Sequence, residues 1–263
     1  MGAGVFDAAQ SEAPASVLDV NMTAQLDFHE VTLRYPLYNS HNLSLRRNLV
    51  GIATGGKLSS GADEVPQVTA LDRVSFQIRS GDSVGLMGHN GAGKSSLLRT
   101  MAGIYTPLEG RIERLGSVAT MLEVGAGMDP ELSGFENAQR MGMMLGMSRS
   151  EIVAKLPEIE EFTELGDFMQ LPVRTYSAGM SMRLMFAVAT STQPDILLVD
   201  EVFEVGDAAF KERAAQRMSE FIRSSQIFVF ASHSVDRIKQ YCNRVFVLNH
   251  GSVTEVPLSE LGC

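Results

Sequence analysis

Residues 88–95 read GHNGAGKS. It matches the pattern G-x-x-x-x-G-K-[ST], in which glycines let the backbone curl until successive N–H groups point at a phosphate chain. That chemistry needs a strand before the loop and a helix after it. The apolar run SVGLMG, residues 83–88, predicts the strand, and SSLLRTMAGIY, residues 95–105, predicts the helix. The complete pattern in this context favours a phosphate-binding loop over a plain glycine-rich turn.

We expect the loop and the residue after it to surround the phosphates of a nucleotide. Lys94 is expected to reach the β- and γ-phosphates, and Ser95 to bind Mg²⁺. The N–H groups at the start of the following helix add a positive dipole end. The predicted binding residues are Gly88, His89, Asn90, Gly91, Ala92, Gly93, Lys94, Ser95 and Ser96.

Two carboxylates follow a second buried strand, ILLVDE at residues 196–201. The carboxyl end of such a strand is where α/β proteins bind ligands. We expect Asp200 to hold Mg²⁺ and Glu201 to act as general base toward the attacking water. Two acids after a strand can also simply cap the next element, so the assignment depends on the phosphate loop.

Strand and helix patterns alternate through most of the chain, which predicts an α/β fold with a mainly parallel sheet flanked by helices. An N-terminal β part is expected from residues 26–35 and 71–78, and a helical subdomain from about 131–175. Residues 36–66 are interpreted as an inserted loop with a short helix, and residues 1–22 and 257–263 as a flexible N-terminal tail and a short C-terminal tail. Further strands and helices are predicted at 111–115, 117–124, 177–191, 195–201, 227–232 and 245–256, with helices from Asp207 and Ser234.

The composition limits the class of protein. A formal net charge of −9 and a pI near 5.1 argue against wrapping the backbone of nucleic acid, so we expect no nucleic-acid partner. Cys242 and Cys263 are too few for a disulfide framework and lack the spacing of a zinc site, which favours the cytosol. No apolar run reaches the roughly 18–20 residues of a membrane-spanning helix.

The stretch RTYSAGMSMRL, residues 174–184, separates this chain from kinases, GTPases and recombinases, which share the first two motifs. It resembles LSGGQ, the signature motif of ABC ATPases. It departs from that motif at Tyr176, Ala178 and Met180. Ser177 and Gly179, which touch the γ-phosphate in the family, are retained, although Ser177 also suits a plain N-cap. The resemblance implies that Ser177, Ala178 and Gly179 bind ATP held by a second copy of the chain.

Two further residues lie at positions in the chain where ABC ATPases carry functional residues. Asp207 resembles the D-loop aspartate that crosses the dimer interface, and it could equally cap the helix that follows. His233, after the strand IFVFAS, resembles the switch histidine at the γ-phosphate, whereas a lone histidine at a strand end is usually structural.

The adenine pocket and the Q-loop are the least regular parts of the resemblance. Tyr35 matches the aromatic residue that stacks on adenine, with Tyr38 as a substitute and a core tyrosine as the competing interpretation. The Q-loop glutamine has no obvious counterpart. Glu123 lies near its place, and its carboxylate could ligate Mg²⁺ or order water.

Within the superfamily, LEVGAGMDPELSGFEN and DEVFEVGDAAF look like the ATPase subunits of exporters for O-antigen, capsular and teichoic polysaccharides and mycobacterial galactan. The resemblance covers residues about 26–256, and the ABC ATPase domain is expected to span 23–256. The insertion at 36–66 also resembles these subunits. Because the chain stops at Cys263, we expect no carbohydrate-binding domain and no direct recognition of a glycan cap.

The resemblance implies a homodimer of ATPases with two copies of a multi-spanning permease, at the cytoplasmic face of a bacterial inner membrane. The alternatives are a soluble ABC ATPase acting on nucleic acid or ribosomes, an ABC exporter of another substrate, and a P-loop kinase. A group of methionines between the Glu123 loop and the signature predicts a permease-docking surface, or else it fills the core of the subdomain. These are Met128, Met141, Met143, Met144 and Met147.

Overall fold

The computed structural model describes residues 23–36, 58–59, 67–121, 127–200 and 208–261. Its first sheet has the strand order β2-β3-β1-β5, in which all three pairings are antiparallel. Alternating apolar residues turn one face of this sheet inward, including Leu26 and Phe28, which are buried. The predicted N-terminal antiparallel part is confirmed. Its strands are β1 (Gln25–Pro36), β2 (Leu58–Ser59), β3 (Gln67–Arg79) and β5 (Glu109–Leu115).

The second sheet has the order β10-β9-β4-β8-β7-β6, and every pairing in it except β10 with β9 is parallel. Its central strands read ILLV and IFVFA and are buried along their whole length, as expected for strands covered on both faces. The mainly parallel sheet is thereby confirmed. Its strands are β4 (Ser83–Met87), β6 (Val118–Met121), β7 (Ile196–Val199), β8 (Ile227–Ala231), β9 (Arg244–Asn249) and β10 (Ser252–Val256).

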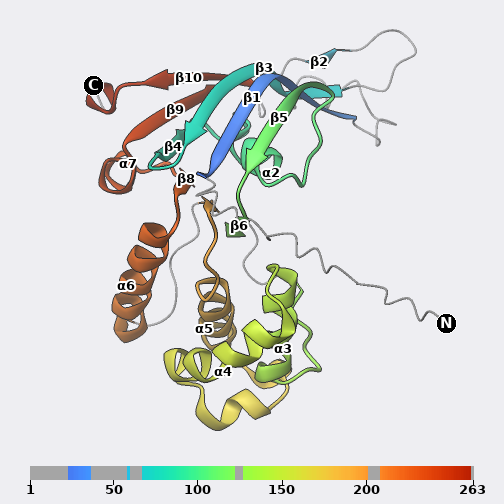
Figure 1. Ribbon diagram of the computed structural model, residues 1–263, viewed down its shortest axis with the longest axis vertical. Coiled ribbons are helices and arrows are strands. Elements are labelled where there is room, and N and C mark those ends of the chain that lie inside the picture. The colour runs from blue at the N-terminus through green and yellow to red at the C-terminus, as the bar shows by residue number, and fades with distance from the viewer. Residues whose placement is uncertain (1–22, 37–57, 60–66, 122–126, 201–207, 262–263) are drawn as a thin grey trace, which may run out of the picture.

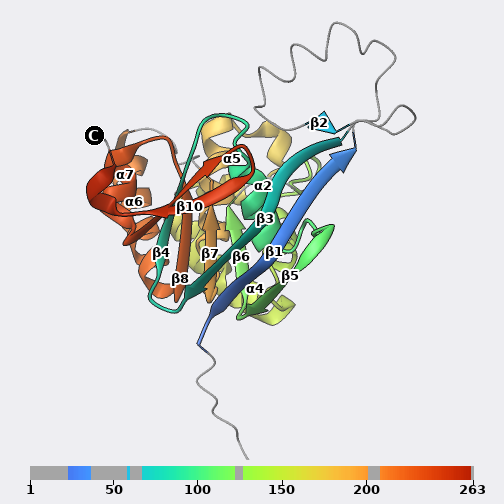
Figure 2. The ribbon, with the colours of Figure 1, turned by 90° about the horizontal axis from the view of Figure 1, so that it is seen from above.

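Helix α2 (Lys94–Met101) lies between the two sheets, as Figure 2 shows from above. Its buried residues Leu97, Leu98 and Met101 join one hydrophobic cluster with Phe28 of the first sheet and Val229 of the second. The helix that opens from the phosphate loop is therefore fixed on both sides by packed apolar side chains.

A helical subdomain projects from the sheets (Figure 1) and has its own hydrophobic cluster. Its first two helices each begin with a capping box, in which Ser133 pairs with Glu136 and Ser148 with Glu151. The subdomain contains α3 (Gly134–Met144), α4 (Arg149–Thr163), the short 3₁₀ segments η1 (Gly166–Gln170) and η2 (Val173–Thr175), and α5 (Ala178–Ala189).

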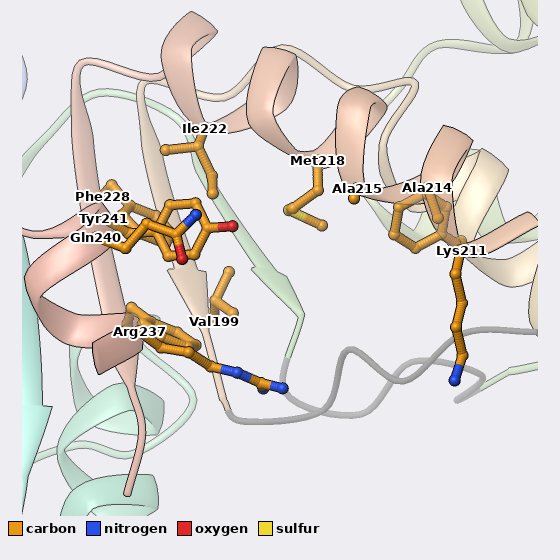
Figure 3. A pocket seen from close by; sticks show the side chains of 12 residues that line it. Val199, Lys211, Ala214, Ala215, Met218, Ile222, Phe228, Arg237, Gln240 and Tyr241 are labelled. Carbon is orange, nitrogen blue, oxygen red and sulfur yellow. The ribbon is translucent and has the colours of Figure 1, made fainter. Parts of the chain in front are cut away.

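The remaining helices are α6 (Ala208–Ser224), α7 (Val235–Tyr241) and the 3₁₀ segment η3 (Leu258–Glu260). A mostly apolar cavity of about 330 Å³ lies between α6, α7 and the sheet, with Lys211 and Arg237 among the side chains that line it (Figure 3). No helix in the described part of the chain is both long and apolar enough to cross a membrane.

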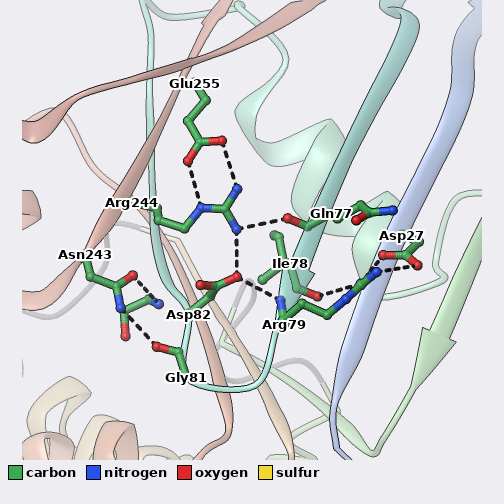
Figure 4. A network of polar contacts seen from close by, with 10 residues as sticks. Asp27, Gln77, Ile78, Arg79, Gly81, Asp82, Asn243, Arg244 and Glu255 are labelled. Carbon is green, nitrogen blue, oxygen red and sulfur yellow. Dashed lines mark hydrogen bonds and ion pairs between the residues drawn. The ribbon is translucent and has the colours of Figure 1, made fainter.

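A polar network joins the two sheets away from this cavity (Figure 4). Arg244 donates two hydrogen bonds to Glu255, at 2.7 and 2.8 Å, and one to Asp82 at 2.7 Å. The same guanidinium reaches the carbonyl oxygen of Gln77 at 2.9 Å, in the first sheet. Hydrogen bonding from Arg244 holds the pKa of Glu255 below its ordinary value. Glu255 is therefore charged at neutral pH, and through Arg244 it links β10 to β3 of the first sheet.

Two of the sequence-based boundaries are wrong by four residues. The helix predicted over 95–105 ends at Met101, because the chain turns at Gly103, whose φ is +77°. The strand predicted from Leu71 begins at Gln67, because it pairs with β1 as far as Pro36. The helix expected within 36–66 lies outside the described residues.

Candidate functional site

The phosphate loop connects β4 to α2, as its sequence predicts. Gly93 adopts φ +108° just before the helix, and a Cβ there would lie 2.7 Å from the carbonyl oxygen of Ala70. Gly88 has φ +151°, and a Cβ would lie 2.5 Å from the carbonyl oxygen of Leu248. Residues with a side chain are therefore disfavoured at both ends of the curl, so the path of the loop depends on glycine at Gly88 and Gly93.

Lys94 is the first residue of α2, and its side chain turns back over the loop. Its Nζ donates to the carbonyl oxygens of Gly88 at 2.7 Å and His89 at 3.2 Å. The residue is only 9% exposed, so water screens its charge weakly. The ammonium is thereby held within the loop that the sequence assigns to the phosphates. His89 itself places its ring against that of His250, with 5.2 Å between centroids.

Ser95 and Asp200 are brought together by the tertiary structure although 105 positions separate them. Ser95 Oγ donates to Asp200 Oδ2 at 2.9 Å, joining the start of α2 to the end of β7. A hydroxyl beside a carboxylate is an oxygen-donor pair of the kind that Mg²⁺ prefers, usually together with substrate phosphates. These two residues fit the metal that the sequence predicts.

The carboxyl ends of β4, β7 and β8 lie side by side in the second sheet. The phosphate loop, Asp200 and His233 follow these three strands, so parallel pairing places them at one edge. They line a cavity of about 280 Å³ together with residues of the first sheet. The loop residues in the lining are Asn90, Gly91, Ala92, Gly93, Lys94, Ser95 and Ser96. His233 is exposed and thus accessible from this cavity.

Tyr35 lines the same cavity from the end of β1. It is half-buried, and burial raises the pKa of its hydroxyl, so the phenol stays protonated at neutral pH. Its ring meets the ring of Tyr105 edge to face at 5.4 Å. The two interpretations of Tyr35 both keep support, because the residue packs against the core and also faces the cavity.

Part of the cavity wall was missed by sequence reasoning. Val68, Thr69 and Ala70 of β3 contribute to it, as do His250 and Gly251 in the turn between β9 and β10. The backbone N–H of Asp72 donates to Gly251 O at 3.0 Å, which joins these two segments. No motif marks them, because they form the wall through strand pairing rather than through their side-chain chemistry.

The signature segment lies elsewhere. Ser177 caps α5, since its Oγ accepts from Met180 N at 3.2 Å, and the residues from Ser177 to Gly179 are exposed. Ser177 and Gly179 line a separate hollow of about 250 Å³, with Glu164 and Arg183. The structure confirms the N-cap and does not bring these residues to the Lys94 cavity of the same chain.

Four of the predicted residues lie outside the described part of the chain. These are Tyr38, Glu123, Glu201 and Asp207. Their roles stay predictions.

The chain matches the family model described as "ABC transporter" over residues 71–204, which include the phosphate loop, the signature segment and the acidic strand. The chain belongs to the ABC transporter family. This ABC protein is 62% identical over 230 residues to the O-antigen export system ATP-binding protein RfbE of Yersinia enterocolitica. That match covers 88% of the chain and 96% of the relative.

A second relative of this ABC protein is the teichoic acids export ATP-binding protein TagH of Bacillus anthracis, which is 35% identical over 234 residues. The match covers 89% of the chain and 41% of the relative. Among solved structures, the ABC protein resembles the ATP-binding cassette MJ0796, a dimer in a post-hydrolysis state bound to ADP and Pi. The TM-score is 0.60 at 20% identity, over 89% of the chain and 98% of the structure. At that identity the likeness establishes the fold.

Proposed function

We propose that this chain is the ATP-hydrolysing subunit of an exporter of lipid-linked polysaccharide. The observation that carries the proposal is the cavity where Lys94, Ser95 and Asp200 meet in a chain 62% identical to an O-antigen export protein. A second relative, at 35% identity, is named for export of teichoic acids. Both relatives are named as ATP-binding proteins of export.

Different residues of the site have different roles in ATP hydrolysis. Water attacks the γ-phosphorus of ATP, the bond to the β–γ bridging oxygen breaks, and ADP and phosphate leave. Lys94 and the N–H groups of the loop stabilise the charge that develops on the phosphate oxygens. Ser95 and Asp200 would hold Mg²⁺, which neutralises part of that charge. Glu201, the residue after Asp200, is the proposed acceptor of the water's proton, and His233 the proposed contact to the γ-phosphate.

The working unit is a head-to-tail dimer of two such chains. Ser177 and Gly179 line a hollow other than the Lys94 cavity, so a partner is needed for them to meet a nucleotide. The exposed N-terminus of α5 offers N–H groups and a positive dipole end to the γ-phosphate bound by the partner. Ala178 adds a further N–H, and Asp207 is the proposed contact across the same interface.

The membrane part is a separate permease, which keeps this subunit at the cytoplasmic face of the membrane. The methionine group supports a docking surface in part. Met143 and Met144 are 46% and 61% exposed, whereas Met141 is buried in the subdomain core. Exposed flexible thioethers suit the binding of another protein's helix.

Replacing Met144 with Glu should release the subunit from a co-expressed permease without lowering its Tm. If the variant still co-purifies with the permease, the docking surface lies elsewhere.

The test of the function is complementation of a strain that lacks this subunit. In this strain, lipid-linked polysaccharide should accumulate on the cytoplasmic side of the membrane, and expression of the wild-type chain should restore polysaccharide to the cell surface. The Lys94→Ala chain, produced at the same level, should not. Surface polysaccharide restored by that variant, or an unchanged surface in the deletion strain, would contradict the proposal.

A further inference from the structure

Three helices of different parts of the chain meet beside the signature segment. Phe162 of α4, Phe186 of α5 and Phe210 of α6 form an aromatic group with centroid distances of 5.3–6.3 Å. Phe186 and Phe210 are 1% exposed. Phe162 packs against both the cluster of the helical subdomain and the cluster under the second sheet. This is therefore a joint between the subdomain and the body of the protein.

One carboxylate bridges the two other helices at this joint. Glu164 Oε1 lies 2.6 Å from Nη1 of Arg213 in α6, and Oε2 lies 3.9 Å from Nη1 of Arg183 in α5. Both guanidinium groups also lie over the ring of Phe210, at 5.7 and 4.8 Å from its centroid. The side chain of Arg183 is 19% exposed, so part of this arrangement is shielded from solvent. We name Phe162, Glu164, Arg183, Phe210 and Arg213 the subdomain clasp.

The backbone conformation at Glu164 favours residues other than glutamate. It ends α4 in the left-handed conformation, with φ 53° and ψ 32°. Glycine or asparagine adopts that conformation with less strain than glutamate, and both are common at this place in a helix. Helix termination alone therefore disfavours glutamate here, whereas a bridge between two arginines requires its carboxylate.

The position of the clasp connects it to catalysis. Glu164 and Arg183 line the same hollow as Ser177 and Gly179. Helix α6, which carries Arg213, begins eight positions after Asp200 in the chain. We propose that Glu164 is a positioning residue, whose carboxylate sets the signature end of α5 relative to α6 and the acidic strand before it. The inference rests on the proposed function, because it concerns how the signature meets the nucleotide of a partner chain.

The test compares Glu164→Gly and Glu164→Asn with Glu131→Gln, all in the complex with the permease. Glu131 pairs with Arg174 at 3.3 Å in the same subdomain and serves as the matched control. Glycine and asparagine relieve the left-handed backbone strain, which offsets the lost ion pair and, for glycine, the larger entropy of the unfolded chain, so Tm should change little. The kcat for ATP should fall about threefold to tenfold in both Glu164 variants, as expected for loss of a partly exposed bridge between two helices. The affinity of the isolated chain for ATP, which the Lys94 cavity sets, should change less than about twofold.

A charge exchange gives an independent readout. Arg213→Glu alone should lower kcat, and combining it with Glu164→Arg should restore part of the loss, which a purely local defect at either position would not do. Wild-type kcat in Glu164→Gly, a loss of kcat that parallels a loss of Tm, or equal losses in the Glu131→Gln control would each overturn the assignment. Failure of the proposed function can be told apart from failure of this inference. If the proposed function is wrong, Lys94→Ala hydrolyses ATP at the wild-type rate, whichever residue stands at position 164.

Discussion

Replacing Lys94 with Ala should nearly abolish ATP hydrolysis while leaving the fold intact. Lys94 is 9% exposed and its ammonium is held by two loop carbonyls, so its charge can act on the phosphates with little screening by water. Removing one preorganised electrostatic contact costs about 2.7–4 kcal/mol in the transition state. That loss corresponds to a fall in kcat of about 100- to 1,000-fold.

The effect on stability should be small by comparison. The variant loses two hydrogen bonds to the loop, which destabilises it, but it also no longer buries a charge, and these two effects oppose each other. We expect Tm to change by less than about 4 °C. Phosphate release by the purified complex measures kcat, and calorimetry measures Tm.

A matched control is available within the same chain. Lys239 also donates to a backbone carbonyl, that of Leu261 at 2.9 Å, and it lies outside the nucleotide cavity. Lys239→Ala should therefore keep wild-type kcat. If Lys94→Ala loses less than about tenfold, or if the two lysine variants lose equally, the reasoning about the phosphate loop is refuted.

Three further predictions concern the adenine side, the dimer and the response to acid. Tyr35→Phe should keep the affinity for a fluorescent ATP analogue, whereas Tyr35→Ala should weaken it about tenfold through lost stacking; equal affinities would leave Tyr35 a core residue. Glu201→Gln should slow hydrolysis and accumulate an ATP-bound dimer in light scattering, and adding Ser177→Arg should prevent it; a dimer that forms regardless would exclude the signature from the interface. Arg244 lowers the pKa of Glu255, so the stability from this pair is present above the unfolded pKa of about 4.3 and is lost as pH falls through the lower folded value. Glu255→Gln should accordingly lower Tm at pH 7, and its Tm difference from wild type should shrink as the pH is lowered through the acid range; a Tm difference that does not change with pH would contradict the linkage.

Local chemistry explains what the sequence alone determined. The phosphate loop is contiguous in the sequence. Its glycines and its lysine could therefore be assigned to phosphate binding, because the residues of the loop are neighbours in the chain. The strands ending at Val199 and Ala231 could be predicted because central parallel strands are apolar throughout. Ser177 could be predicted as a helix start because a cap bonds within three residues.

Long-range packing decided the rest. The methionine run predicts either a core or a docking surface, and burial alone separates Met141 from Met144, three positions away. The cavity wall at Ala70 and Gly251 depends on which strands pair. The bridge from Glu164 to Arg183 and Arg213 joins three helices, and no hydrophobic periodicity in the sequence predicts that these helices meet. Such contacts arise from how the elements fold onto one another, so they follow from the tertiary structure and not from any segment read alone.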